Sequence, residues 1–166
     1  RFNQGIFEDG SPMTVTRTPF SYGVACYPEK HDEAPNLESD LMWLKRKVDA
    51  GAQYAVTQLF YDNRRYFDFV DRAHKAGITV PIIPGIKPLK RTAQLSIIPK
   101  TFKVDIPQEL AEAVEQCAGD DEKVRQVGIE WCVAQCRELM EHGVPSLHFY
   151  SVAAEDSIRE VAKQIF

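Results

Sequence analysis

Polar and aromatic side chains follow several short apolar runs of this chain, at the point where each run ends. Tyr27 and His31 follow the first run, Gln58 ends the second, Lys87 follows the third, and Ser151 follows the fourth. A Gln amide offers both a donor and an acceptor, and a His titrates near neutral pH. Because a parallel barrel builds its active site at the C-terminal ends of its strands, the pattern predicts an enzyme with its site at these four ends.

The elements that must position these residues alternate along the chain. Helix signals follow the apolar runs, with Asn36 as a predicted N-cap and either Asp62 or Asn63 as the next. The irregular leading segment 1–19 precedes the first strand. We expect strands at 20–27, 54–60, 80–83 and 146–151, and helices at 36–50, 63–76, 92–97, 108–117, 122–141 and 156–166, with a loop across Pro99. Strand–helix repeats with short connections predict an α/β fold with a parallel sheet.

Length and charge limit the classes of protein. The 166 residues suit one domain spanning 1–166, and the formal net charge is -4 with a sequence pI near 5.6. Without a Lys/Arg stripe we expect no nucleic-acid partner, and without a long apolar run we expect no membrane span. Because the chain begins at Arg1 rather than Met, we expect that further sequence precedes it.

The cysteines indicate a reducing compartment rather than a metal site. Cys26, Cys117, Cys132 and Cys136 form no Cys-x-x-Cys motif, and no His-x-x-x-His spacing accompanies them. We therefore predict no bound metal and small buried thiols in a cytoplasmic protein.

Five short motifs in a fixed order give the chain a family resemblance over about residues 20–166. They are Tyr27-Pro-Glu-Lys-His31, Leu44-Lys-Arg-Lys-Val-Asp-Ala-Gly-Ala52, Thr57-Gln-Leu-Phe60, Ile82-Ile-Pro-Gly-Ile86 and Leu147-His-Phe-Tyr150. In this order and spacing, the motifs resemble the methylenetetrahydrofolate reductase family.

The resemblance implies a fold and an activity. The family fold is a TIM-type (β/α)8 barrel, of which this chain would supply about four C-terminal βα units, a half-barrel. The implied function is a flavin-dependent oxidoreductase that reduces 5,10-methylenetetrahydrofolate to 5-methyltetrahydrofolate, with FAD as cofactor and NADH or NADPH as reductant. The general-acid Glu of the family would lie upstream of Arg1, so no catalytic residue is assigned and we expect the fragment alone to be inactive.

The resemblance also assigns ligand contacts residue by residue. The FAD contacts would be Tyr27, His31, Ala34, Asp40, Arg46 and Lys47, with Trp43 at a further family contact position of variable residue type. Cations suit a diphosphate, and an aromatic ring suits a flat cofactor. Judged from the residues alone, these side chains equally fit a packed loop and the solvated face of an amphipathic helix.

The folate contacts implied by the resemblance are Gln58, whose amide matches the pterin edge, and Gln94, which would contact folate or the nicotinamide cofactor. Two positions depart from the family. Ile98 stands where some members carry a Phe that stacks on the substrate, so Phe102 is an alternative, and Ala154 stands where some carry a basic residue. We interpret His148 as a structural residue of the last strand.

Two other functions fit the residues. The first is a non-catalytic half-barrel that folds or self-associates without binding FAD, because its missing neighbours would leave open strand edges. The second is another α/β-barrel enzyme that binds a phosphorylated metabolite, although no Gly-rich phosphate loop precedes the last strand. In either of the enzyme interpretations we expect a small-molecule substrate and a homo-oligomer.

Overall fold

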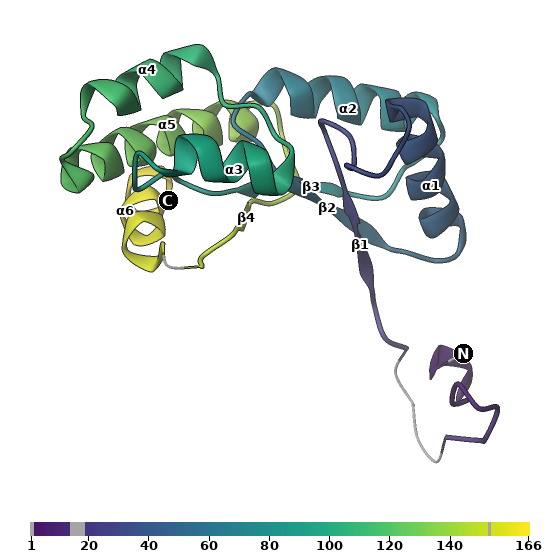
Figure 1. The fold of residues 1–166 in the computed structure, drawn as a ribbon. Helices are drawn as coiled ribbons and strands as arrows, with labels where there is room; N and C mark the ends of the chain where they lie inside the picture. Colours follow the sequence, from purple (N-terminus) through teal and green to yellow (C-terminus); the bar gives the residue numbers. More distant parts are fainter. Residues whose placement is uncertain (1, 14–18, 153) are drawn as a thin grey trace.

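The computed structural model describes residues 2–13, 19–152 and 154–166. Within these residues the strands form one sheet of order β1-β2-β3-β4, and each neighbouring pair is parallel (Figure 1). The predicted α/β fold with a parallel sheet is therefore confirmed. In chain order the elements are a short 3-10 helix Phe2–Gln4, β1 Gly23–Cys26, α1 Leu37–Asp49, β2 Tyr54–Leu59, α2 Asn63–Lys75, β3 Ile82–Ile86, α3 Gln94–Phe102, α4 Gln108–Gln116, α5 Asp121–Glu141, β4 His148–Phe149 and α6 Glu155–Ile165.

The first two long helices begin where the capping residues predict. The Asn36 side chain accepts a hydrogen bond from the backbone N–H of Ser39 at 2.8 Å, and the Asp62 side chain accepts one from Arg64 at 3.0 Å. Each bond satisfies an N–H that the first helical turn leaves without a partner. Gly51 and Gly77 follow these helices with φ of 111° and 77°, the left-handed conformation that ends a helix.

The strands differ from the prediction in length and position. β1 and β4 are shorter than expected, and β3 begins at Ile82 and runs through Pro84 and Gly85, which we had predicted to close it. Pro84 has no N–H to give to the ladder. The register shifts between β2 and β3, and the Gly85 N–H donates instead to Thr57 Oγ1 at 2.8 Å. A side-chain bond thus lets the strand continue past the proline.

Helix α3 is also longer than predicted and contains Pro99, where we expected a loop. Ile98 beside it is buried in an apolar cluster with residues from β2 and from α4 and α5. The helix ends soon afterwards at Lys103, whose φ is 55° and whose N–H donates to the Pro99 carbonyl at 3.0 Å. Packing of this segment outweighs the local cost of the proline.

The sheet has two different faces because successive residues of a strand point to opposite sides. One side, here called the covered face, carries buried side chains that pack with α1, α2, α5 and α6: Cys26, Ala55, Ile82 and Ile86. Figure 1 shows α2, α4 and α5 above the strands. The alternate residues form what we call the open face, and none of the following is buried: Ala25, Tyr54, Val56, Gln58, Ile83 and His148.

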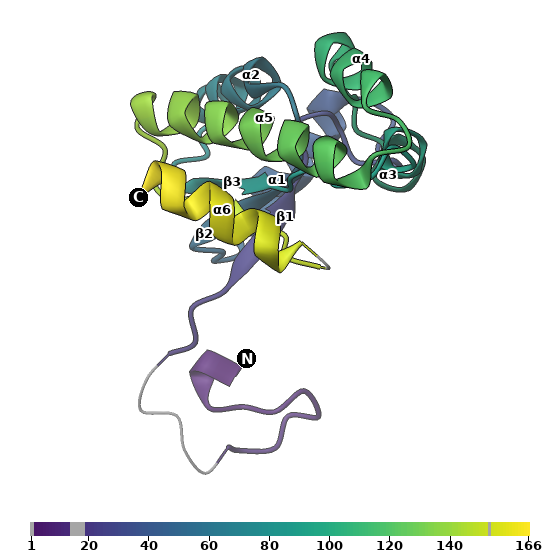
Figure 2. The same cartoon turned by 90° about the vertical axis from the view of Figure 1, so that its left-hand side faces the viewer.

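The two ends of the chain lie in different surroundings. Figure 2 shows α5 and α6 side by side, and Val161 of α6 belongs to the same apolar cluster as Ile129 of α5. Residues 2–13 lie apart from the sheet and the helices in both views (Figures 1 and 2). The sheet and its helices, rather than the leading segment, therefore position the candidate site.

Candidate functional site

The polar residues that follow the strands gather at one edge of the sheet. Cys26 pairs with Thr57, so Tyr27 lies beside Gln58, and Ile86 pairs with Phe149, so Lys87 lies beside Tyr150. All of these pairs are parallel, which brings the C-terminal ends of the strands together. The expected common edge is confirmed, and it is the candidate functional site.

Gln58 is half-buried on the open face, next to this edge. Its Oε1 accepts a hydrogen bond from the backbone N–H of the following residue, Leu59, at 2.9 Å. The bond lies where the register between β2 and β3 shifts. This bond uses one of the two lone pairs of the amide oxygen, so the side chain still offers two N–H donors and one acceptor site to a ligand.

The loop after β1 brings Tyr27, His31 and Asp40 together. The Tyr27 and His31 rings meet edge to face with centroids 4.6 Å apart. Asp40 Oδ2 accepts the backbone N–H of His31 at 2.8 Å, and His31 Nδ1 accepts the N–H of Glu33 at 3.2 Å. An accepting Nδ1 places the proton of the neutral ring on Nε2. Asp40, predicted as a direct cofactor contact, thus holds the loop that carries His31.

Lys30 organises the same loop, a role that sequence reasoning missed. Its φ is 87°, unusual for a residue with a side chain. Its ammonium donates to the carbonyl oxygens of His31, Asp32 and Ala34 at 2.8, 3.2 and 2.6 Å. These three bonds fix the conformation of the loop around half-buried Ala34. No pattern in the sequence indicates such an internal contact.

The predicted cationic residues on α1 lie on its surface. Arg46 and Lys47 are exposed, and the Arg46 guanidinium lies 4.7 Å from the centroid of the exposed Trp43 ring. This stacking keeps the charge available because it uses the face of the guanidinium rather than its N–H edge. The helix starts beside the loop that carries His31, since Asp40 in its first turn bonds to that loop.

The residues predicted as ligand contacts in the segment after β3 differ in their hydrogen bonds and in their burial. Gln94 Oε1 accepts the backbone N–H groups of Lys90 and Arg91 at 2.7 and 3.1 Å, so its carbonyl closes the turn before α3. Ile98, which stands where some family members carry a stacking Phe, is only 2% exposed because its side chain fills the core. Phe102 remains 37% exposed.

The last strand end contributes aromatic and backbone groups. His148 is exposed, and its ring meets the Tyr150 ring edge to face at 4.8 Å. The Tyr150 hydroxyl donates to the Thr57 carbonyl at 2.7 Å, which connects β4 to β2 across β3. Ala154 is buried before α6. Burial raises the pKa of the Tyr150 and Tyr27 hydroxyls, so both are neutral at physiological pH.

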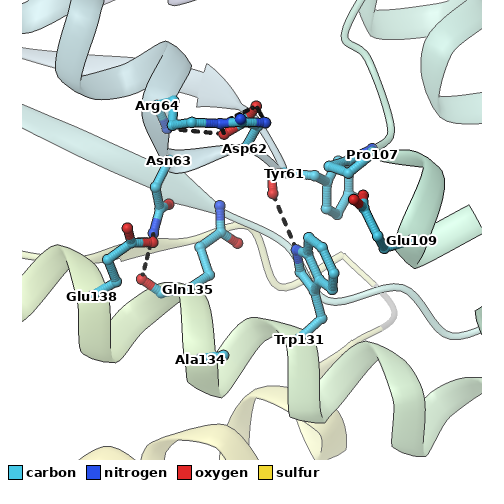
Figure 3. Close-up of a pocket in the computed structure, with 10 residues that line it drawn as sticks. All are labelled: Tyr61, Asp62, Asn63, Arg64, Pro107, Glu109, Trp131, Ala134, Gln135 and Glu138. Carbon is cyan, nitrogen blue, oxygen red and sulfur yellow. Dashed lines mark hydrogen bonds and ion pairs between the residues drawn. The ribbon is translucent and has the colours of Figure 1, made fainter.

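A separate cavity of about 400 Å³ lies between the start of α2 and helix α5 (Figure 3). Asn63 Nδ2 donates to the Gln135 carbonyl at 3.0 Å and to Glu138 Oε2 at 2.6 Å. Trp131 Nε1 donates to the Tyr61 carbonyl at 3.1 Å. The polar side chains that line the cavity are therefore already hydrogen-bonded to one another or to backbone. None of the sequence-predicted site residues lines this cavity.

The part of the chain that the structure describes has neither a metal-binding cluster nor a membrane-spanning helix. There, no group of three or more His, Cys, Asp or Glu side chains is arranged to hold a metal ion. In the same part of the chain, no helix combines the length and the apolar character that a membrane span needs. Cys26, Cys132 and Cys136 are buried free thiols, as predicted, whereas Cys117 is partly exposed.

An all-parallel α/β sheet with polar residues at its C-terminal edge defines the class of protein, and sequence comparison gives the family. Residues 15–166 match the family model described as methylenetetrahydrofolate reductase. The chain belongs to this family. It is 42% identical over 147 residues to the "Probable methylenetetrahydrofolate reductase (NADPH)" of Caenorhabditis elegans, covering 88% of this chain and 22% of that protein.

Other relatives agree on the family and differ in how much of them the chain covers. The 5,10-methylenetetrahydrofolate reductase of Escherichia coli is 41% identical, over 80% of this chain and 45% of that protein. The chain thus spans less than half the length of these curated relatives. One solved structure aligns with a TM-score of 0.57 at 20% identity, over 87% of this chain and 53% of that one. It is an uncharacterized Clostridium thermocellum protein that binds 5-methyl-5,6,7,8-tetrahydrofolic acid, and this likeness concerns the fold alone.

Proposed function

We propose that this chain takes part in the reduction of 5,10-methylenetetrahydrofolate to 5-methyltetrahydrofolate, with FAD as cofactor and NADH or NADPH as reductant. Family membership supports the reaction, and the names of relatives include both NADPH and NADH forms. The observation that carries the proposal is the pairing of Cys26 with Thr57 at one sheet edge, because Tyr27 and Gln58 directly follow these two residues. The register therefore brings a predicted cofactor contact next to a predicted folate contact.

The same proposal includes the architecture. Strands β1 to β4 would be half of a (β/α)8 barrel, and the open face would be its interior. Supporting observations are the exposed Ala25 and Tyr54 on that face and the lack of a second neighbour for β1 and β4 among the described residues. Cys26, Cys132 and Cys136 are buried free thiols, which fits a reducing cytoplasm.

The residues present fit FAD in their chemistry. Arg46 and Lys47 are exposed cations suited to a diphosphate, and His31 keeps a donor at Nε2 for a ribose or phosphate oxygen. Tyr27 offers a neutral ring beside Gln58. When bound, FAD supplies the hydride storage that no side chain provides.

Gln58 suits the pterin of the folate. Its amide N–H groups make no bond to the Leu59 backbone, whose N–H uses one lone pair of the oxygen, and a pterin carries carbonyl and ring-nitrogen acceptors. Gln94 keeps the N–H groups of its own amide in the same way, because its oxygen closes the turn before α3. Both glutamines would therefore donate to ligands.

The test uses the full-length enzyme with Gln58→Ala. Folate-dependent reoxidation of the reduced flavin is expected to slow by about tenfold or more, because losing a buried hydrogen bond costs about 1–3 kcal/mol. Reduction of the flavin by NAD(P)H should stay within about twofold. Stopped-flow absorbance of the flavin separates the two half-reactions. The control is Gln53→Ala, an exposed glutamine just before the start of β2. Equal damage to both half-reactions would refute the folate role of Gln58.

A second candidate function is a self-associating fragment that binds no FAD. The specific observation in its favour is exposed aromatic surface near the β1 edge, with Phe20 61% and Tyr22 42% exposed. Analytical ultracentrifugation of residues 1–166 with and without FAD tests it. Dimers or larger species without flavin absorbance favour this candidate, whereas a monomer that retains FAD excludes it.

A further inference from the structure

Lys87 lies at the candidate site, and no carboxylate of the described residues is at ion-pair distance from it. It directly follows β3, and the alternation of that strand puts it on the same side as Ile83 and Gly85, the open face. Its ammonium donates to the carbonyl oxygens of Tyr150 and Val152 at 3.3 and 3.1 Å. The cation therefore lies over the end of β4, between the last two strands.

Some lysines of the fold have a carboxylate partner in the part of the chain that the structure describes, and Lys87 does not. Lys45, Lys123 and Lys163 each form an ion pair with a carboxylate three or four residues away along the chain. Within the described residues Lys87 has no carboxylate at ion-pair distance. Two carbonyl dipoles hold the ammonium in place but do not neutralise it, and one of its three N–H donors is left over.

The electrostatic surroundings favour an incoming anion. Burial and the nearby Lys90 lower the pKa of Lys87, whereas Glu155 acts in the opposite direction from the exposed first turn of α6. An oxyanion beside the ammonium would relieve the unfavourable burial of the charge.

We propose that Lys87 is the cationic contact of an anion subsite and that its ligand is a carboxylate on the glutamate tail of the folate. The inference rests on the proposed function, in which the pterin meets Gln58. The end of β4 lies two strands from β2, a separation of roughly 10 Å. An elongated folate that starts at Gln58 and crosses the strand ends reaches Lys87 with its tail. The diphosphate of NAD(P)H is the other source of an oxyanion.

The experiment compares variants of the full-length enzyme. Lys87→Met keeps the length of the side chain and removes its charge, and Lys87→Arg restores a cation. Lys100→Met removes an exposed charge from α3 and is the matched control. Each protein is assayed with methylenetetrahydrofolate and with methylenetetrahydropteroate, which lacks the glutamate. Equilibrium binding of 5-methyltetrahydrofolate is measured by calorimetry, together with the melting temperature.

Lys87→Met is expected to raise the KM for methylenetetrahydrofolate and the Kd for 5-methyltetrahydrofolate by about tenfold, the usual effect of losing a charge-assisted hydrogen bond. The KM for the pteroate substrate, the KM for NAD(P)H and the melting temperature should not change. Lys87→Arg should recover most of the affinity. Equal effects on both folates, or no effect, would overturn the inference, as would an increase confined to the KM for NAD(P)H. A wild-type enzyme that binds no folate would instead refute the proposed function.

Discussion

The two faces of the sheet are built from the same strands and differ in almost every other respect. Along β2, Ala55, Thr57 and Leu59 are at most 2% exposed, whereas Tyr54, which precedes Ala55 and points to the other face, is 36% exposed. The covered face packs against helices that begin at well-defined caps. The open face carries the glutamine that we assign to the ligand. One face therefore specifies the fold, and the other is the face that we propose for binding.

The largest effect that tests the difference between the two faces is expected at two adjacent isoleucines of β3. Ile82 is 4% exposed on the covered face, and Ile83 is half-buried on the open face. Ile82→Ala is expected to lower the free energy of unfolding by about 2–5 kcal/mol, because it removes buried methyl groups and leaves a cavity. Ile83→Ala should cost less than about 1 kcal/mol in residues 1–166. Urea unfolding followed by circular dichroism measures both.

The same two substitutions also test the proposed barrel architecture. In a full-length enzyme whose remaining strands cover the open face, Ile83→Ala should become as costly as Ile82→Ala. Equal costs in residues 1–166 would mean that the open face is already packed and that the two faces do not differ as described.

A smaller effect is expected from Lys30, whose ammonium fixes the loop beside the site. Lys30→Met loses three hydrogen bonds and keeps a side chain at a φ of 87°, whereas Lys30→Gly loses the bonds but relieves the backbone strain. Hydrogen exchange of the Ala34 amide, which donates to the His31 carbonyl, should quicken by about tenfold in Lys30→Met and by less in Lys30→Gly. Exchange in the helix α5 is the internal control, and an opposite order of the two variants would contradict this role.

The sequence predicted the helices of the fold better than its strands. Asn36 and Asp62 act through bonds to residues two or three positions away, so a local pattern is enough to locate the helices that they cap. The course of β3 depends on Thr57, which replaces a ladder bond across 28 residues, and no local pattern encodes that contact. Likewise, Pro99 suggested a loop because the sequence does not reveal the core that Ile98 enters.

The candidate site shows the same division. Alternation and strand order were enough to place Tyr27, Gln58 and Lys87 at one edge. Alternation and strand order do not predict the hydrogen bonds that decide which donors and acceptors each side chain still has available for a ligand. Gln58 and Gln94 use their oxygens on neighbouring backbone, and Asp40 uses a carboxylate oxygen on the loop of His31. Such competition between local backbone and ligand depends on the folded geometry.

The smallest predicted effect concerns pH and the carboxylate of a residue in the loop after β1. Glu29 follows β1, and its Oε2 accepts the backbone N–H of Asp105 at 2.8 Å. Burial is the main influence and raises the pKa of Glu29. The hydrogen bond from the Asp105 N–H and the charge of Arg65 act against it, and the carboxylates of Asp105 and Asp62 act with it. Because the folded state holds this proton more tightly, the stability from protonated Glu29 is complete below its ordinary pKa and is lost as pH rises through the raised value.

The variant Glu29→Gln keeps an acceptor for the Asp105 N–H and cannot ionise. Its melting temperature relative to the wild type should therefore increase by about 1–3 °C between pH 4 and pH 7. Glu33→Gln, an exposed neighbour in the same loop, should follow the wild type across this range. A melting-temperature difference between Glu29→Gln and the wild type that does not change with pH would show that folding does not shift the pKa of Glu29. In that case the loop after β1 is as exposed to solvent as the open face.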